Sequence, residues 1–201
     1  MAHNTLAPWA EAVAGVPYPL TIDDLLTRPD DGWTYELVEG RLVKMPPSGF
    51  GASSMGVTLS AALYLYTRTH NLGRVSGADG EYVLSGPGEP VTAFAPDIAF
   101  VRAERLPLRE SPEWDRPWQL APDLAVEIAS PNQFRPEMAE KAQRYLVAGV
   151  RLVWVIWPKQ RQVDVWHLDT QQAMTTLGIG QSLDGLDVVP GFSYAIADLF
   201  T

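Results

Sequence analysis

The sequence contains no cysteine and only three histidines, and both shortages limit the chemistry that the protein can perform. Without cysteine the chain can form neither a disulfide nor a thiolate metal site, and a reducing cytoplasm is the favoured compartment. His3, His70 and His167 lie too far apart in the sequence for a histidine-rich zinc motif. A metal ion would therefore need hard oxygen ligands, which favour Mg²⁺ or Mn²⁺.

Long apolar runs and an excess of positive charge are also missing. No stretch approaches the roughly 18 apolar residues that span a membrane, and the N-terminus lacks the basic start of a secretory signal. The net charge of −9 argues against a surface that coats nucleic acid generally, because such binding neutralises phosphates with lysine and arginine. A local basic groove or a bound metal stays compatible with this charge. We expect neither a membrane partner nor an organic cofactor.

The chain otherwise has the composition of an ordinary soluble globular protein, with 201 residues, 46% of them hydrophobic and 19% charged. This length favours a single domain over residues 1–201. Within it we expect a core over about residues 35–168, an N-terminal arm at 1–20 and a C-terminal tail at 183–201.

Hydrophobic periodicity predicts strands alternating with helices, and therefore a mixed α/β fold. Residues 35–47 form two alternating runs joined at Glu39-Gly40, which is typical of a β-hairpin. The order strand, helix, strand over residues 123–158 predicts a crossover between two parallel strands. Helices are expected at 21–28, 53–73 and 136–149, further strands near 74–84, 95–102 and 162–168, and an exposed loop at 103–120.

Glu127 is the first candidate reactive residue, because it interrupts the otherwise apolar strand LAVEIA. A buried ionised carboxylate is costly unless it is paired or binds a metal, whereas at a strand end it can simply face solvent. Asp123 lies on the same strand but roughly 13 Å away, too far to share one ion. Asp97 begins a different strand, and adjacent strands lie only about 4.8 Å apart. Asp97 can therefore converge with Glu127 on one cation, unless it only forms a Pro-Asp turn.

The third expected helix and the hairpin supply the remaining candidates. Lys141 and Tyr145 lie one turn apart on one face, with Arg144 beside them, and we expect Arg144 and Tyr145 to contact the substrate. The alternative is a solvated helix face on which Lys141 pairs with Glu137. Glu36 shares a hairpin face with a valine that we expect to be buried. This placement is compatible with two interpretations of Glu36, a functional residue or a residue at the rim of the core.

Four segments, taken in order, resemble the Uma-two family of restriction endonuclease-like proteins, which belongs to the PD-(D/E)XK nuclease superfamily. They are YELVEGRLVKMPPSG, PDIAFV, PDLAVEIASPNQ and EKAQRYLVAGVRLVWVIWP, and together they extend over about residues 35–158. The resemblance implies a mixed β-sheet with a helix on each side and a site where two central strands splay. It also implies hydrolysis of phosphodiester bonds with Mg²⁺ or Mn²⁺ as the cofactor.

The resemblance assigns metal ligands to individual residues. Asp97 matches the aspartate that binds magnesium in the superfamily, and Glu127 matches the acidic residue of the (D/E)XK motif. The main-chain carbonyl of Ile128 would be a further ligand. Glu36 matches an early glutamate of the family, which would act as an outer or second-metal ligand.

The chain departs from the superfamily pattern at two places. The lysine normally follows the acidic residue by two positions, where this chain has Ala129, and Lys141 of the next helix matches it instead. Lys141 would hold or deprotonate the attacking water or contact the phosphate, and burial beside a metal can lower a lysine pKa. Relatives often carry a histidine after the hairpin, but this chain reads FGASSMG there.

A Mg²⁺-dependent endodeoxyribonuclease is the leading hypothesis, with Asp97, Glu127, Lys141 and Glu36 as its catalytic residues and DNA as its substrate. The alternative is a nuclease-fold binding or scaffold protein without turnover, which the acidic charge and the missing histidine favour. Hydrolysis of another phosphate ester also stays open, because a metal site reads the phosphate and not the base. Cleavage of both strands favours a homodimer, with the tryptophans of residues 150–158 as either an apolar interface or ordinary core.

Overall fold

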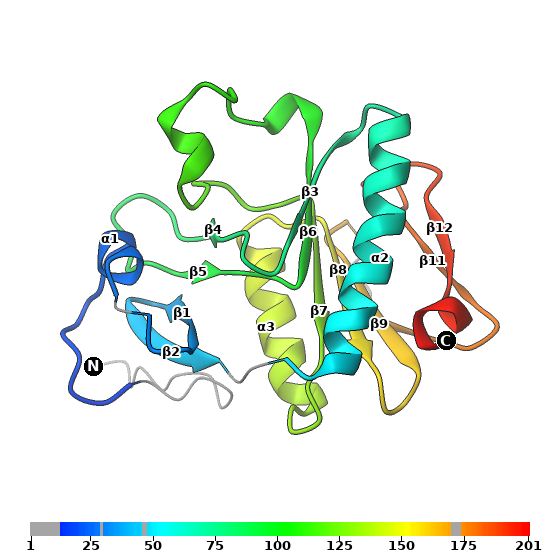
Figure 1. Ribbon diagram of the computed structural model, residues 1–201, viewed down its shortest axis with the longest axis horizontal. Coiled ribbons are helices and arrows are strands. Elements are labelled where there is room, and N and C mark those ends of the chain that lie inside the picture. Colours follow the sequence, from blue (N-terminus) through cyan, green and yellow to red (C-terminus); the bar gives the residue numbers. More distant parts are fainter. Residues whose placement is uncertain (1–12, 29, 46–47, 170–173) are drawn as a thin grey trace.

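A six-stranded mixed sheet forms the centre of the computed structural model, which describes residues 13–28, 30–45, 48–169 and 174–201 (Figure 1). Most of the expected N-terminal arm lies outside the described residues. The strand order is β10-β9-β8-β7-β6-β3. In chain order these strands are β3 (Gly73–Gly77), β6 (Ile98–Arg102), β7 (Leu124–Ile128), β8 (Leu152–Trp157), β9 (Gln162–His167) and β10 (Thr175–Gly178).

The crossover predicted from the sequence is present. Strands β7 and β8 pair in parallel, and helix α3 (Arg135–Val147) connects them. Pro136 lies in the first turn of α3, and Gly149 adopts a φ of 97° just after the helix, which stops it from continuing. Glu137 accepts a hydrogen bond from the Phe134 N–H at the start of the helix. Lys141 pairs instead with Glu36 and Glu127, so the alternative of a Lys141–Glu137 pair is wrong.

The two faces of the central sheet pack against different elements. Along β7, Leu124, Val126 and Ile128 face the core that contains helix α2 (Phe50–Thr69). Ala125 and the following Ala129 face the core that contains α3. Because side chains alternate along a strand, Glu127 belongs to the α3 face.

A second sheet carries the N-terminal hairpin. Its strand order is β2-β1-β5-β4, with β1 (Thr34–Val38), β2 (Arg41–Met45), β4 (Tyr82–Val83) and β5 (Ala93–Phe94), and helix α1 (Ile22–Leu26) precedes it. The expected single strand over 74–84 is therefore wrong, because β3 and β4 belong to different sheets. A turn closed by the hydrogen bond from Gly80 N–H to the Gly77 carbonyl separates them, at 2.9 Å.

The C-terminal residues form part of the main core. Strands β11 (Ser182–Asp184) and β12 (Ser193–Ala195) and the 3-10 helix η3 (Ile196–Phe200) lie beside α2 (Figure 1). The Tyr66 hydroxyl of α2 donates a hydrogen bond to the Pro190 carbonyl at 2.9 Å. The segment expected to be an exposed loop contains two short 3-10 helices, η1 (Ala103–Arg105) and η2 (Pro112–Asp115).

The tryptophans of β8 are core residues, which decides between the two alternatives of an apolar interface and ordinary core. Every residue of β8 is buried, with Trp154 fully enclosed and Trp157 3% exposed. The strand lies between β7 and β9, so its side chains are covered by α2, α3 and the C-terminal residues. No helix among the described residues is long and apolar enough to cross a membrane.

Asp123 has a structural position, as its separation from Glu127 predicts. It is 1% exposed and accepts a hydrogen bond from the Arg102 N–H at 2.9 Å. The Arg105 guanidinium pairs with its other oxygen at 2.8 Å. The carboxylate thereby holds the end of β6 against the start of β7.

We expect Asp123→Ala to lower the free energy of unfolding by about 1–3 kcal/mol, because the Arg102 N–H and the Arg105 guanidinium lose a buried acceptor. Urea denaturation measures this change. The exposed Asp115 provides the control, and Asp115→Ala should leave the free energy of unfolding almost unchanged. Equal effects of the two substitutions would contradict the structural role of Asp123.

Candidate active site

A pocket of about 340 Å³ collects the four residues that the sequence selects as catalytic. Glu36 reaches it from β1, Asp97 from the residue before β6, Glu127 from β7 and Lys141 from α3. Residues at the start of α2 and after β8 complete its lining. Segments separated by more than a hundred residues therefore meet at one place.

The register between β6 and β7 brings Asp97 to Glu127. Ile98 pairs with Val126 in an antiparallel ladder, so the next step along both strands reaches Asp97 and Glu127. Asp97 Oδ2 accepts a hydrogen bond from the Ile128 N–H at 2.7 Å. A side-chain carboxylate thus satisfies this N–H at the point where β6 begins and the chain arrives from the other sheet.

Glu127 is a paired, buried carboxylate, and the solvent-facing alternative is wrong. Its side chain lies within the α3 face, and the residue is 7% exposed. The Lys141 ammonium lies 3.0 Å from Glu127 Oε1, and the Tyr145 hydroxyl donates a hydrogen bond to the same oxygen at 2.6 Å. Burial and the neighbouring Glu127 raise the pKa of Tyr145 well above its ordinary value, so the hydroxyl keeps its proton as a donor.

Glu36 is also buried, at 2% exposure, so its rim alternative is wrong. Its Oε1 accepts hydrogen bonds from Lys141 Nζ at 3.0 Å and from the Ala95 N–H at 3.2 Å. Its Oε2 is buried without a hydrogen-bond partner in the described part of the chain. Burial raises the pKa of Glu36 to about 7, although Lys141 opposes this shift. A buried oxygen without a partner is an uncommon and costly arrangement that a bound cation would relieve.

The pocket raises the pKa values of both Lys141 and Asp97, but for different reasons. Burial alone would lower the pKa of Lys141, but the adjacent Glu127 and Glu36 outweigh it and raise that pKa. The two glutamates therefore favour the charged ammonium form of Lys141. Burial raises the pKa of Asp97 to about 6, and the charge of Glu127 adds to the shift.

The donor groups of the pocket suit a divalent metal. Asp97, Glu127 and Ile128 line it, and carboxylate and carbonyl oxygens are the ligands that Mg²⁺ and Mn²⁺ prefer. The partnerless Glu36 Oε2 is a further oxygen available to a cation. The oxygen-rich lining therefore fits the kind of metal that the sequence implies, and Asp97, Glu127 and the Ile128 carbonyl are the groups that would hold it.

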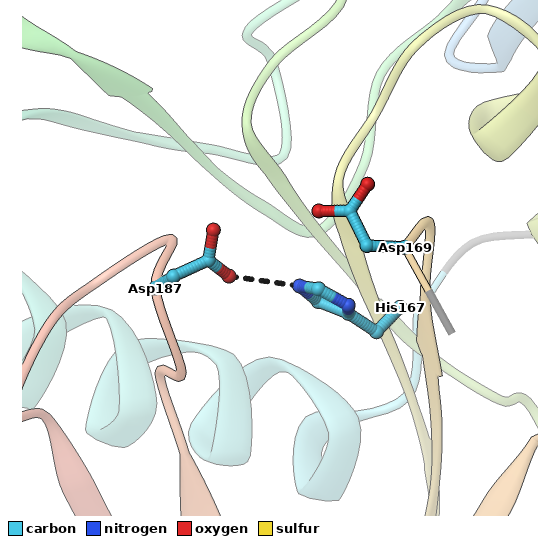
Figure 2. Close-up of side chains that lie close together, drawn as sticks. All are labelled: His167, Asp169 and Asp187. Atoms are coloured by element: carbon cyan, nitrogen blue, oxygen red, sulfur yellow. Dashed lines mark hydrogen bonds and ion pairs between the residues drawn. The ribbon is translucent and has the colours of Figure 1, made fainter.

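A tighter group of potential metal ligands lies elsewhere, near the end of β9 (Figure 2). The His167 ring is 2.8 Å from Asp187 Oδ1, and Asp169 lies next to it. Arg151 contacts the carboxylate of Asp187 and lies 3.6 Å from that of Asp169. The Arg151 guanidinium lies against both carboxylates, and the contacts of Asp187 with Arg151 and His167 link the C-terminal segment to β8 and β9.

Two predicted substrate contacts are not on the pocket lining. Arg144 forms ion pairs with Glu39 at 2.8 Å and with Glu140 at 3.4 Å. Tyr145 is fully buried and contacts Glu127 from the helix side. This anchoring role escaped the sequence analysis, because the spacing of Tyr145 from Lys141 shows a shared helix face but not its contact with Glu127.

Two further acidic residues escaped the sequence analysis. Glu81 is half-buried and lies directly before β4, after the turn that follows β3. Burial together with the charge of Glu36 raises the pKa of Glu81 to about 7. No periodic pattern marks it, because it follows a turn. Asp164 of β9 is 1% exposed and is held by Arg135 and the Trp157 indole N–H. The position of Asp164 among the apolar residues of an alternating strand could have indicated that its carboxylate is buried.

Comparisons with known proteins agree with this geometry. Residues 22–197 match the Uma2 family, which is described as "Putative restriction endonuclease". Among solved structures, a "putative nuclease belonging to DUF820" from Anabaena variabilis ATCC 29413 is similar, with a TM-score of 0.73 at 21% identity. The alignment covers 90% of this chain and 98% of that chain, which shows a shared nuclease fold. No curated protein matches the chain. Because the match covers most of its length, the chain belongs to the Uma2 family of restriction endonuclease-like proteins.

Proposed function

We propose that this protein is a Mg²⁺- or Mn²⁺-dependent endodeoxyribonuclease. The observation that carries the proposal is the pocket in which Glu36, Asp97, Glu127 and Lys141 meet, with one buried oxygen of Glu36 left without a partner. Membership in a restriction endonuclease-like family supports the same chemistry. Hydrolysis of a phosphodiester requires a positioned nucleophile and stabilisation of developing negative charge, and the pocket holds groups for both tasks.

Asp97, Glu127 and the Ile128 carbonyl would hold the metal. When bound, it supplies a Lewis acid for the phosphoryl oxygen and lowers the pKa of an attacking water. The Lys141 ammonium, whose charged form Glu127 and Glu36 favour, would stabilise negative charge on the phosphate. Tyr145 fixes the orientation of Glu127 from behind, and Glu36 keeps Lys141 in place through its 3.0 Å contact. Glu36 Oε2 is the group available for a further metal or water contact.

Asp97→Asn and Glu127→Gln should each abolish Mg²⁺-dependent cleavage of DNA while the fold is retained, because each removes a charged ligand without changing size. Gel analysis of plasmid and oligonucleotide substrates measures cleavage, and titration calorimetry measures Mn²⁺ binding. Asp123→Asn is the matched control, since Asp123 pairs with Arg105 outside the pocket and its substitution should affect stability and leave metal binding intact. Cleavage that persists in both ligand variants would contradict the proposal. Metal binding without any cleavage across substrates would favour the alternative of a binding protein.

Metal affinity should fall as the pH drops below about 6. The pKa of Asp97 is raised to about 6 in the folded protein, so the ionised form destabilises the metal-free fold above that pH. A metal must displace this proton at lower pH, which costs roughly tenfold in affinity per pH unit. The increase in melting temperature on adding Mn²⁺ should therefore be larger at pH 8 than at pH 5. An equal increase at both values would show that Asp97 is not a ligand.

Tyr145→Phe should lower kcat by about tenfold and leave the KM for DNA nearly unchanged, because the hydroxyl orients Glu127 and does not reach the pocket surface. Steady-state kinetics separates the two constants. A rise in KM with kcat preserved would restore the substrate-contact role that the sequence indicates. Arg144→Gln serves as the comparison on the same helix, and its pairs with Glu39 and Glu140 predict little change in kcat.

A further inference from the structure

Three pockets of the structure follow one another along the edge strand β3, and each shares a lining residue with the next. The active-site pocket shares Asp79 with a second pocket of about 500 Å³, and the second shares Arg74 with a third of about 560 Å³. Strand β3 is the last strand of the six-stranded sheet. Its residues Arg74 to Ser76 line the second pocket, and Gly73 and Arg74 line the third. We name this series of pockets the β3 track.

The middle pocket of the β3 track is aromatic. The rings of Trp114 and Trp118 have centroids 5.5 Å apart, and Tyr82 packs edge-on against Trp118 at 6.1 Å. The Trp118 indole N–H donates to the Trp114 carbonyl at 3.3 Å, which fixes the relative position of the two residues. Both tryptophans are only half-buried. Aromatic side chains held in this way are platforms on which unpaired bases stack.

Acidic side chains also line the middle pocket, and they decide which part of a nucleotide it can take. Asp79, Glu81 and Asp115 contribute carboxyl groups there, next to the tryptophans. Negative charge repels a phosphate, whereas a base carries no charge and offers donors to carboxylate oxygens. The middle pocket therefore suits a base and not the backbone.

The third pocket of the β3 track is positively charged. Arg68, Arg74 and Arg109 line it, and all three are exposed. None of the three makes an ion pair with a carboxylate within the described ranges of the chain. Arg68 donates to the Tyr64 hydroxyl at 2.6 Å, and Arg74 lies 5.9 Å from the Trp114 ring, so both are positioned without being neutralised.

Neighbouring arginines behave differently. Arg105 pairs with Asp123, and Arg116 pairs with Asp23. The third pocket instead gathers three arginines without a carboxylate partner, in a chain with a net charge of −9. Such a group is suited to phosphate, to which guanidinium groups bind through paired hydrogen bonds.

We propose that the β3 track binds one unpaired strand of DNA. The scissile phosphate lies in the active-site pocket, an unpaired base stacks on Trp114 and Trp118, and neighbouring phosphates contact Arg68, Arg74 and Arg109. This inference rests on the proposed nuclease function and adds the substrate class, which is single-stranded or locally unpaired DNA. Bases within a duplex are already stacked and cannot enter an aromatic pocket unless they are extruded.

Fluorescence anisotropy tests this inference without any cleavage step. The full-length protein carrying Asp97→Asn is titrated in EDTA against a fluorescein-labelled single-stranded oligonucleotide and against the same sequence as a duplex. We expect tighter binding of the single strand. Adding Trp114→Ala should weaken that binding by roughly tenfold or more, whereas Trp114→Phe should keep most of it because the ring is retained.

The arginines are tested in the same assay. Arg74→Ala and Arg109→Ala should each weaken binding and reduce the slope of log affinity against log salt by about 0.7. Arg41→Ala is the matched control: Arg41 lies on β2, outside the three pockets, with its guanidinium 4.6 Å from the Tyr18 ring. The control should leave binding and slope unchanged. Thermal melting shows that each variant is folded before it is titrated.

The outcomes separate this inference from the nuclease function. Duplex binding as tight as single-strand binding, or equal effects of Arg74→Ala and Arg41→Ala, overturns the β3 track. A Trp114→Ala protein that binds as tightly as its parent overturns it as well. Single-strand binding that depends on the track, in a protein that cleaves no DNA with Mg²⁺ or Mn²⁺, supports the track and overturns the nuclease function.

Discussion

The contacts of the Lys141 ammonium with Glu36 and Glu127 are the interaction on which the functional end of the molecule depends. Each contact is 3.0 Å long, and all three side chains are buried. They join the hairpin sheet, the central sheet and α3 at one point. A single buried carboxylate would be costly there, but the positive charge between the two makes both tolerable. The same contacts fix the positions of the acidic groups that face the pocket.

Strand geometry was sufficient to predict which aspartate accompanies Glu127. The separation along one strand excludes Asp123, and the structure shows that Asp123 instead pairs with Arg105. Asp97 is brought close by the antiparallel register of β6 and β7. The crossover through α3 followed equally from the order of the elements. These features depend on local patterns, so they can be read from the chain.

The second sheet was not predictable in the same way. Strands β4 and β5 have two residues each, too short to produce a periodic pattern, and β5 pairs with β1 through Leu37 and Ala93. That pairing joins segments far apart in the sequence, and it is what buries Glu36. The anchoring of Glu127 by Tyr145 was missed for a similar reason, since helical spacing shows which residues share a face but not what that face covers.

Mutual dependence of Glu36, Glu127 and Lys141 has a consequence for how the family can change over time. Loss of Lys141, or of any two members, leaves an uncompensated buried charge, which in proteins costs about 3–5 kcal/mol, much of the stability of a domain this size. Replacement of all three by apolar residues of similar volume is often tolerated. A lineage that abandoned catalysis would therefore tend to lose the three residues together. Relatives that keep only one of them should be rare. Relatives that keep all three need not be active, because the three residues also depend on one another for stability.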